Sequence, residues 1–166
     1  GNMILDYLLF LVPVLGFIAV LFPMQISAFT NEWQDILALL VAFGFPMVAM
    51  TYFLSYIFDL VSTAFRYMGL MYTLIGFLVP IMIMTILLYS NMSDNAQSII
   101  SAIMYVDPFY PLFLGLYLAA LEGYEVQDLP SYFPGGYVPQ LYVTCSCMVA
   151  VGVLFLTMAI IVDWKQ

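Results

Sequence analysis

Asp107 is the side chain in this sequence with the clearest capacity for chemistry, because it is an acid near the centre of a long apolar stretch. A carboxylate at membrane depth is costly, and such groups are usually functional or paired. The next residue is Pro108, and proline favours the first position of a helix. We therefore favour a structural role in which Asp107 caps a helix, and a functional role is the alternative.

The other residues with reactive side chains form no recognisable site. Cys145 and Cys147 are two positions apart, so they face different sides of a helix and are most simply small packing residues. The chain has no histidine and no cysteine cluster, so a zinc site has no ligand set. A phosphate-loop sequence of the form G-x-x-x-x-G-K-S/T does not occur either. We expect no catalytic residue, metal or cofactor in this chain, which on its own would not hydrolyse ATP.

The composition indicates a membrane protein. Hydrophobic residues make up 66% of the chain and charged residues 7%, whereas roughly 25% charged residues is usual in a soluble domain. The mean hydropathy is +1.10. The net charge of −8 does not point to nucleic acid, because the acids lie between apolar stretches and the sequence has no cationic patch. An ordinary soluble domain and a nucleic-acid-binding protein are therefore excluded.

Long apolar stretches organise residues 1–166 as a single transmembrane domain. A helix needs about 20 apolar residues to cross the hydrocarbon core of a bilayer. Four stretches predict spans, over residues 3–22, 36–58, 67–89 and 141–162. The stretch over residues 98–121 is also long enough, but it has Asp107, Pro108 and Pro111 at its centre, where proline interrupts a helix.

Arg66 and Lys165 are the only two positive charges, and they test any topology drawn for these stretches. Loop Lys and Arg residues mark the cytoplasmic face, while Asp and Glu contribute little to orientation. With Arg66 in the cytoplasm, a complete crossing by residues 98–121 would leave Lys165 on the opposite face. A hairpin that turns at Asp107, Pro108 and Pro111 returns both charges to one face. We therefore predict an all-α polytopic membrane protein with four transmembrane helices and one re-entrant helical hairpin.

This topology predicts where the loops lie. The link at Arg66 and the C-terminal end of the chain are expected in the cytoplasm, and residues 90–97 and 122–140 on the extracellular or lumenal side. Asn91 begins the sequence Asn-Met-Ser, so we expect it to be a possible glycosylation acceptor in a eukaryotic host. Asp6 is expected near the cytoplasmic end of its span, either solvated or touching a coupling element.

Four short motifs, in this order, resemble the membrane domain of the A subfamily of ABC transporters, the lipid-exporting group. The opening segment from Gly1 to Tyr7 is similar to a segment in which Asn and Asp lead into a helix containing Tyr and Pro. The run from Phe45 to Phe58 is similar to a helix that ends in a Ser-Phe-type sequence. Ser62-Thr63-Ala64-Phe65 resembles the link Pro-Ser-Thr-Ala-Tyr, with Val61 in place of the proline. The segment from Asp107 to Gly115 is similar to the Phe-Pro-x-Phe-x-Leu-Gly segment of a hairpin that enters from the extracellular side.

The resemblance implies that the chain comprises the last four membrane-spanning helices and the re-entrant hairpin of one six-helix half. It assigns Ser62, Thr63, Ala64, Phe65 and Arg66 to a link that presses on a nucleotide-binding domain and transmits its motion. A plain polar turn between two helices is the alternative for this link. ATP and magnesium are then expected on a separate nucleotide-binding domain. The implied partners are that domain, the other half of the transporter and membrane lipids.

We therefore expect the chain to be the membrane-spanning part of an ATP-driven exporter of lipid or another hydrophobic substrate. The chain itself is expected not to be an enzyme, while its parent would be an ATP-driven translocase. The alternative is a small structural or assembly subunit of a membrane complex, with no transport path of its own. A channel is a weaker alternative, because no span carries a run of polar residues that could form a ring.

Overall fold

Each of the four apolar stretches predicted to cross the membrane forms a helix that is long enough to do so. The computed structural model describes residues 2–56, 58, 61–89, 92–125, 127, 138 and 140–165. Within them the candidate spans are Met3–Met24, Trp33–Ser55, Arg66–Leu87 and Leu141–Trp164. The chain is a multi-pass membrane protein by the length and hydropathy of its helices. The second span begins and ends three residues earlier than the sequence predicted, and the others differ by two residues or fewer.

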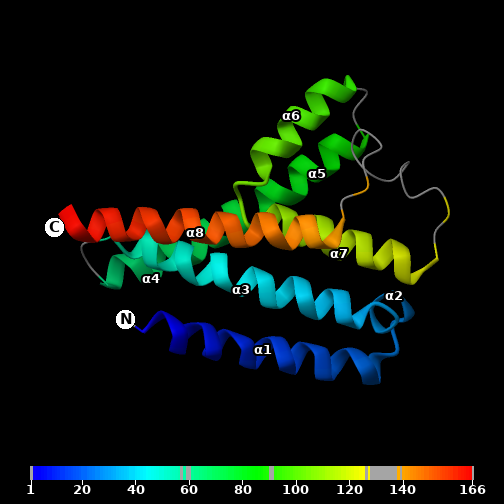
Figure 1. Cartoon of the computed structure of the whole chain (residues 1–166), viewed down its shortest axis with the longest axis horizontal. Helices are drawn as coiled ribbons and strands as arrows, with labels where there is room; N and C mark the ends of the chain where they lie inside the picture. Colours follow the sequence, from blue (N-terminus) through cyan, green and yellow to red (C-terminus); the bar gives the residue numbers. More distant parts are fainter. Residues whose placement is uncertain are drawn as a thin grey trace.

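The first two spans form an antiparallel pair. Helix α1 (Met3–Met24) is capped by Asn2, whose side-chain oxygen accepts a hydrogen bond from the backbone N–H of Leu5. It ends at Gln25 in the left-handed conformation and leads through the short helix α2 (Ser27–Thr30) into α3 (Trp33–Ser55). The two long helices pack together along their length, as Figure 1 shows.

The third span is bent. It consists of α4 (Val61–Thr73), a π-helical turn η1 (Leu74–Leu78) and α5 (Val79–Tyr89). Pro80 lacks a backbone N–H and its ring crowds the preceding turn, which is an established cause of helix kinks, as are π-bulges. In Figure 1, α5 accordingly leaves the direction of α4 and turns away from the bundle.

Helix α4 begins earlier than the sequence predicted. The sequence placed a link between two helices up to Arg66, whereas Val61 to Arg66 already belong to the helix. The physical reason is local: the segment from Val61 to Arg66 holds no glycine and no proline, so nothing in it interrupts a helix. The expected link is therefore the first turn and a half of α4.

The fifth apolar stretch does not form one straight helix. It is divided into α6 (Asp94–Met104) and α7 (Phe109–Gly123), which meet at an angle of 115° across a four-residue break. Because the change of direction exceeds a right angle, the second arm turns back instead of continuing the first. The predicted architecture of four spans and a sharply bent helix pair is confirmed.

The arrangement of the helix ends agrees with a re-entrant hairpin. In Figure 1 the two chain ends and the start of α4 lie at one end of the molecule, which we call the terminal end. The start of α6 and the end of α7 lie toward the other end, which we call the loop end. Arg66 near the start of α4 and Lys165 at the end of α8 (Leu141–Lys165) therefore lie toward the same end, as the charge distribution requires. That the terminal end faces the cytoplasm stays a prediction.

Helix α7 packs against several other helices. It contacts α2, α3, α5 and α8, and every buried cluster contains one of its residues. Tyr110, Leu114 and Leu118 pack on Leu87 of α5; the other clusters use Ala119 against α1 and α3, and Leu112 against α3 and α8. The hairpin arm is thus held from several sides inside the bundle.

Replacement of Gly152 by alanine should loosen the contact between α3 and α8. A Cβ at this position would overlap the ring of Phe45 and lie 3.1 Å from the Cα of Pro46. Overpacking of this kind costs about 1–3 kcal/mol. We expect Gly152→Ala to lower the unfolding midpoint in detergent micelles, followed by circular dichroism. Gly16→Ala is the matched control, because a Cβ at Gly16 meets nothing within 4 Å; equal effects of the two changes would contradict this packing.

Single cysteines test the hairpin topology. Asn95, Glu125 and Arg66 are all exposed, and in a background with Cys145→Ala and Cys147→Ala each can carry the only thiol. We expect Asn95→Cys and Glu125→Cys to react with an impermeant maleimide from the same side of sealed vesicles, and Arg66→Cys from the other side. Labelling of positions 95 and 125 from opposite sides would mean that residues 94–123 cross the membrane completely.

Candidate functional site

The break between α6 and α7 is the most unusual feature of the predicted hairpin. Backbone N–H and C=O groups in the hydrocarbon region must find partners inside the protein, because no water is available there. Every backbone N–H from Tyr105 to Tyr110 has one, apart from Pro108, which carries none. The partners are the carbonyls of Ser101, Ile103, Met104 and Asp107 and, for Phe109, the side chain of Asp107. All backbone N–H groups of the break are therefore hydrogen-bonded inside the protein.

Asp107 occupies this turn as a helix cap. Its Oδ1 atom accepts a hydrogen bond of 3.1 Å from the backbone N–H of Phe109, at the start of α7. The other carboxyl oxygen, Oδ2, is buried and has no hydrogen-bond partner among the described residues. Oδ1 thus caps α7, as the sequence suggested. Oδ2 is a buried polar atom at the turn of the hairpin.

The two prolines of the predicted turn have different places. Pro108 lies in the break directly before α7, and Pro111 is the third residue of α7. Both rings are almost completely buried. The first turn of a helix has backbone N–H groups without helical partners, so a proline there sacrifices no hydrogen bond. Pro111 is consequently part of the second arm and not of the turn.

Phe109 connects the hairpin to the bend in the third span. A Cβ built on Gly76 of η1 would lie 2.7 Å from Cζ of Phe109, so the ring rests against the backbone of the π-helical turn. The same ring contacts Phe43 on α3, with 5.0 Å between ring centroids, and Tyr72 on α4, at 6.3 Å. The π-helical turn η1 and the 105–108 break therefore meet at one aromatic side chain.

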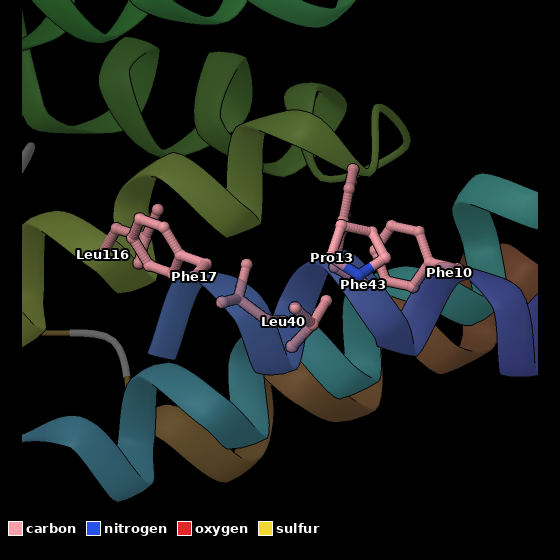
Figure 2. Close-up of a pocket in the computed structure, with 7 residues that line it drawn as sticks. Phe10, Pro13, Phe17, Leu40, Phe43 and Leu116 are labelled. Carbon is pink, nitrogen blue, oxygen red and sulfur yellow. The ribbon is translucent and has the colours of Figure 1, made fainter. Parts of the chain in front are cut away.

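Two apolar grooves lie on either side of the hairpin arm. The first has a volume of about 280 Å³ and is lined by Phe10, Pro13, Val14 and Phe17 of α1, Leu40 and Phe43 of α3, and Leu116 of α7. Figure 2 shows Phe17 and Leu116 toward one end of this groove and Phe10, Pro13 and Phe43 toward the other. The second groove, of about 370 Å³, lies between α5 and α7 and includes Phe29 of α2. Leu116 lines both grooves.

A polar cluster lies at the terminal end of the bundle. The Tyr52 hydroxyl of α3 donates a hydrogen bond to the carboxylate of Asp6 on α1. One residue earlier on α3, Thr51 shares a hydrogen bond of 2.7 Å with the hydroxyl of Tyr72 on α4. A cavity of about 330 Å³ is lined by Asp6, Thr51, Tyr52 and Ser55. Asp6 is therefore partnered by α3, and this cluster joins α1, α3 and α4 near the expected coupling segment.

The expected coupling residues lie at the terminal end of α4. Ser62, Thr63, Ala64, Phe65 and Arg66 are helical; Thr63 is half-buried and Arg66 is exposed. The side chains of Ser62, Ala64 and Phe65 lie outside the described part of the structure. Nearby, desolvation and the neighbouring carboxylate of Asp163 raise the pKa of Tyr56, at the end of α3.

The remaining sequence candidates are Asn91, Cys145 and Cys147. Asn91 lies outside the described residues. Cys145 and Cys147 are free, half-buried thiols on α8. In the described part of the chain, no three His, Cys, Asp or Glu side chains come together in a way that could hold a metal ion.

Comparison with known proteins adds no relative. No protein family, no curated protein and no solved structure matches the chain. The features that bear on function are therefore the membrane topology, the hairpin and the apolar grooves.

The grooves were not predicted from the sequence, although one signal for the first was present. Phe10, Pro13 and Phe17 follow one another at spacings of three and four residues, which places them on one face of a helix. A compact proline ring between two larger phenylalanine side chains on that face predicts a hollow. The contributions of Leu40, Phe43 and Leu116 depend on how three helices pack, and no local pattern encodes that.

Two substitutions of Asp107 distinguish its role as a helix cap from a role of its ionisable carboxylate. Asp107→Asn keeps an acceptor for the N–H of Phe109 and removes the ionisable group, so we expect stability at or above that of the parent. Asp107→Ala leaves this N–H without a partner and should cost about 0.5–2 kcal/mol, as the loss of a helix cap does. Unfolding midpoints in detergent micelles measure both. A loss with Asn as large as that with Ala would show that the carboxylate itself, and not the cap, is needed.

Proposed function

We propose that this chain is the membrane-spanning part of an ATP-driven exporter that moves lipid or another hydrophobic substrate. The observation that carries the proposal is the hairpin. A broken helix pair at membrane depth is costly to build, because its turn must be fully hydrogen-bonded and covered by protein. Here the second arm is surrounded by α2, α3, α5 and α8 and is flanked by apolar grooves. A purely structural helix would need no such interruption.

The resemblance to the A subfamily of ABC transporters supports the same function. Its motifs fall on features that stand out physically: the Asp107 to Gly115 motif covers the break and the start of α7, and the Ser62 to Phe65 motif covers the first turn of α4. The chain itself carries no phosphate loop, so the proposal places ATP and magnesium on a separate nucleotide-binding domain. Further partners are the other half of the transporter and membrane lipids.

A mechanical route links these features. Motion of a nucleotide-binding domain would push on Ser62 to Arg66 and displace α4. Because Thr51 and Tyr72 hydrogen-bond, α4 would carry α3 with it at the terminal end. At the bend, η1 would transmit the motion to Phe109, which rests on Gly76. The hairpin arm would then shift between two packed positions, as packed helices do in alternating states.

The substrate would move along an apolar surface open to the bilayer. Only Arg66 and Lys165 are positively charged, so within this chain the path offers little to hold an anionic head group. Hydrophobic substrates that remain partly in the bilayer fit this surface best. A structural subunit without a path of its own is the competing function, and contact with a nucleotide-binding domain distinguishes the two.

A cross-linking experiment tests the coupling segment. In the cysteine-free background, Arg66→Cys in native membranes should form a short bismaleimide cross-link to a domain that contains a phosphate loop, identified by mass spectrometry. The yield should change when a non-hydrolysable ATP analogue is added, because the domain moves against the segment. Asn95→Cys is the matched control, an exposed position toward the loop end. Absence of any cross-link from position 66 to a nucleotide-binding domain would favour the structural subunit.

A further inference from the structure

The groove between α1, α3 and α7 lies at the middle of the membrane. Phe10 is seven residues after the first residue of α1, Met3, and Phe17 is seven residues before its last, Met24. The groove is therefore centred on the midpoint of the span, and Pro13 lies next to that midpoint. All of its lining side chains are apolar. Whatever fills it must be an apolar group that reaches the centre of the bilayer.

The groove exists because of a local sequence pattern. Pro13 presents a compact ring between Phe10, three residues earlier, and Phe17, four residues later, all on one face of α1. Val14 and Phe43 are buried and form the floor. Leu116 of the hairpin lies toward one end of the groove, beside Phe17, as Figure 2 shows. The protein thus leaves a hollow where a larger residue than proline at position 13 would have filled it.

The groove is continuous with the lipid-facing surface of α1. Phe17 is 49% exposed, and Val12 and Leu15 on the same helix are 65% and 62% exposed. Since α1 is a membrane span, these apolar side chains lie at the depth of the hydrocarbon core and are open to lipid wherever no further helix covers them. A lipid molecule beside α1 can therefore enter the groove sideways, without crossing any polar barrier.

The size of the groove suits a single lipid chain better than a whole helix. Two turns of an α-helix with side chains, about 10 Å wide and about 11 Å long, occupy about 850 Å³. The groove offers about 280 Å³. A transmembrane helix of a partner does not fit into it, whereas a single flexible hydrocarbon chain does.

We propose that this groove binds one fatty acyl chain of a membrane lipid, with Leu116 of the hairpin as one of its contacts. A chain in the first groove touches both the α1–α3 pair and the hairpin arm, so its binding depends on where the hairpin lies. The site does not rest on the proposed exporter function, because a structural subunit would hold the same lipid.

Photo-cross-linking in vesicles tests the site. The purified chain is reconstituted in phosphatidylcholine that carries a diazirine in the middle or at the end of one acyl chain, and adducts are mapped by mass spectrometry. We expect adducts on Phe10, Phe17 and Leu116 to exceed those on exposed Leu15 and Val20 by about threefold per residue, which corresponds to about 0.7 kcal/mol at about 1.4 kcal/mol per factor of ten. A diazirine next to the glycerol should give no such enrichment, because the groove lies at the bilayer centre.

A bulky residue in the hollow provides a second measurement. Pro13→Trp should reduce the adducts on Phe17 and Leu116 to the level of Leu15. Val12→Trp, which adds similar bulk on the exposed side of the same helix, should leave them unchanged. If Pro13→Trp fails to fold, the adduct map of the parent chain decides alone. Equal labelling of groove and lipid-facing residues, or cross-links showing a helix of another chain in the groove, would overturn the proposal.

Discussion

Satisfaction of backbone hydrogen bonds at membrane depth is the constraint on which the rest of this structure depends. An unpaired N–H in hydrocarbon costs several kcal/mol, so a helix can be interrupted there only if the freed groups find partners nearby. The turn between α6 and α7 meets this condition through short-range carbonyls and the side chain of Asp107. The tip must also be covered, which explains why Pro108, Tyr110 and Pro111 are among the most deeply buried side chains. The paired N–H groups and the buried tip together allow the helix to be interrupted at this point.

The same constraint shapes the third span. Pro80 has no backbone N–H and cannot donate a hydrogen bond within the helix. Directly before it lies a π-helical turn, in which the N–H of Val79 donates to the carbonyl of Leu74. That turn exposes the backbone of Gly76 to the ring of Phe109. The interrupted third span and the hairpin thus pack directly against each other, so a displacement of one shifts the other. A rigid bundle of straight helices would have no such joint.

Hydropathy and charge predicted the architecture, because both act over whole segments. The four spans follow from apolar length, and the bent pair follows from Asp107, Pro108 and the position of two positive charges. The start of α4 at Val61 was missed, because a polar segment between two apolar stretches resembles a loop even when nothing in it breaks a helix. The π-helical turn and the two grooves were missed for a different reason. The π-helical turn packs on a distant residue, as the contact of Gly76 with Phe109 shows. The first groove needs Leu116 of α7 beside residues of α1 and α3. Such contacts arise only when distant segments pack.

Packing in a bilayer also explains why a hollow on α1 is tolerated. Lipid tails are as apolar as leucine, so burial alone does not drive helices together and close contact at small residues matters more. Gly152 under Phe45, Gly115 under Leu39 and Gly44 under Phe10 supply such contacts in this protein. In a soluble core, a void the size of the α1 groove would cost stability, because nothing could fill it. At the bilayer centre a hydrocarbon chain is always at hand, so the groove between Phe10 and Phe17 remains packed with lipid in place of protein.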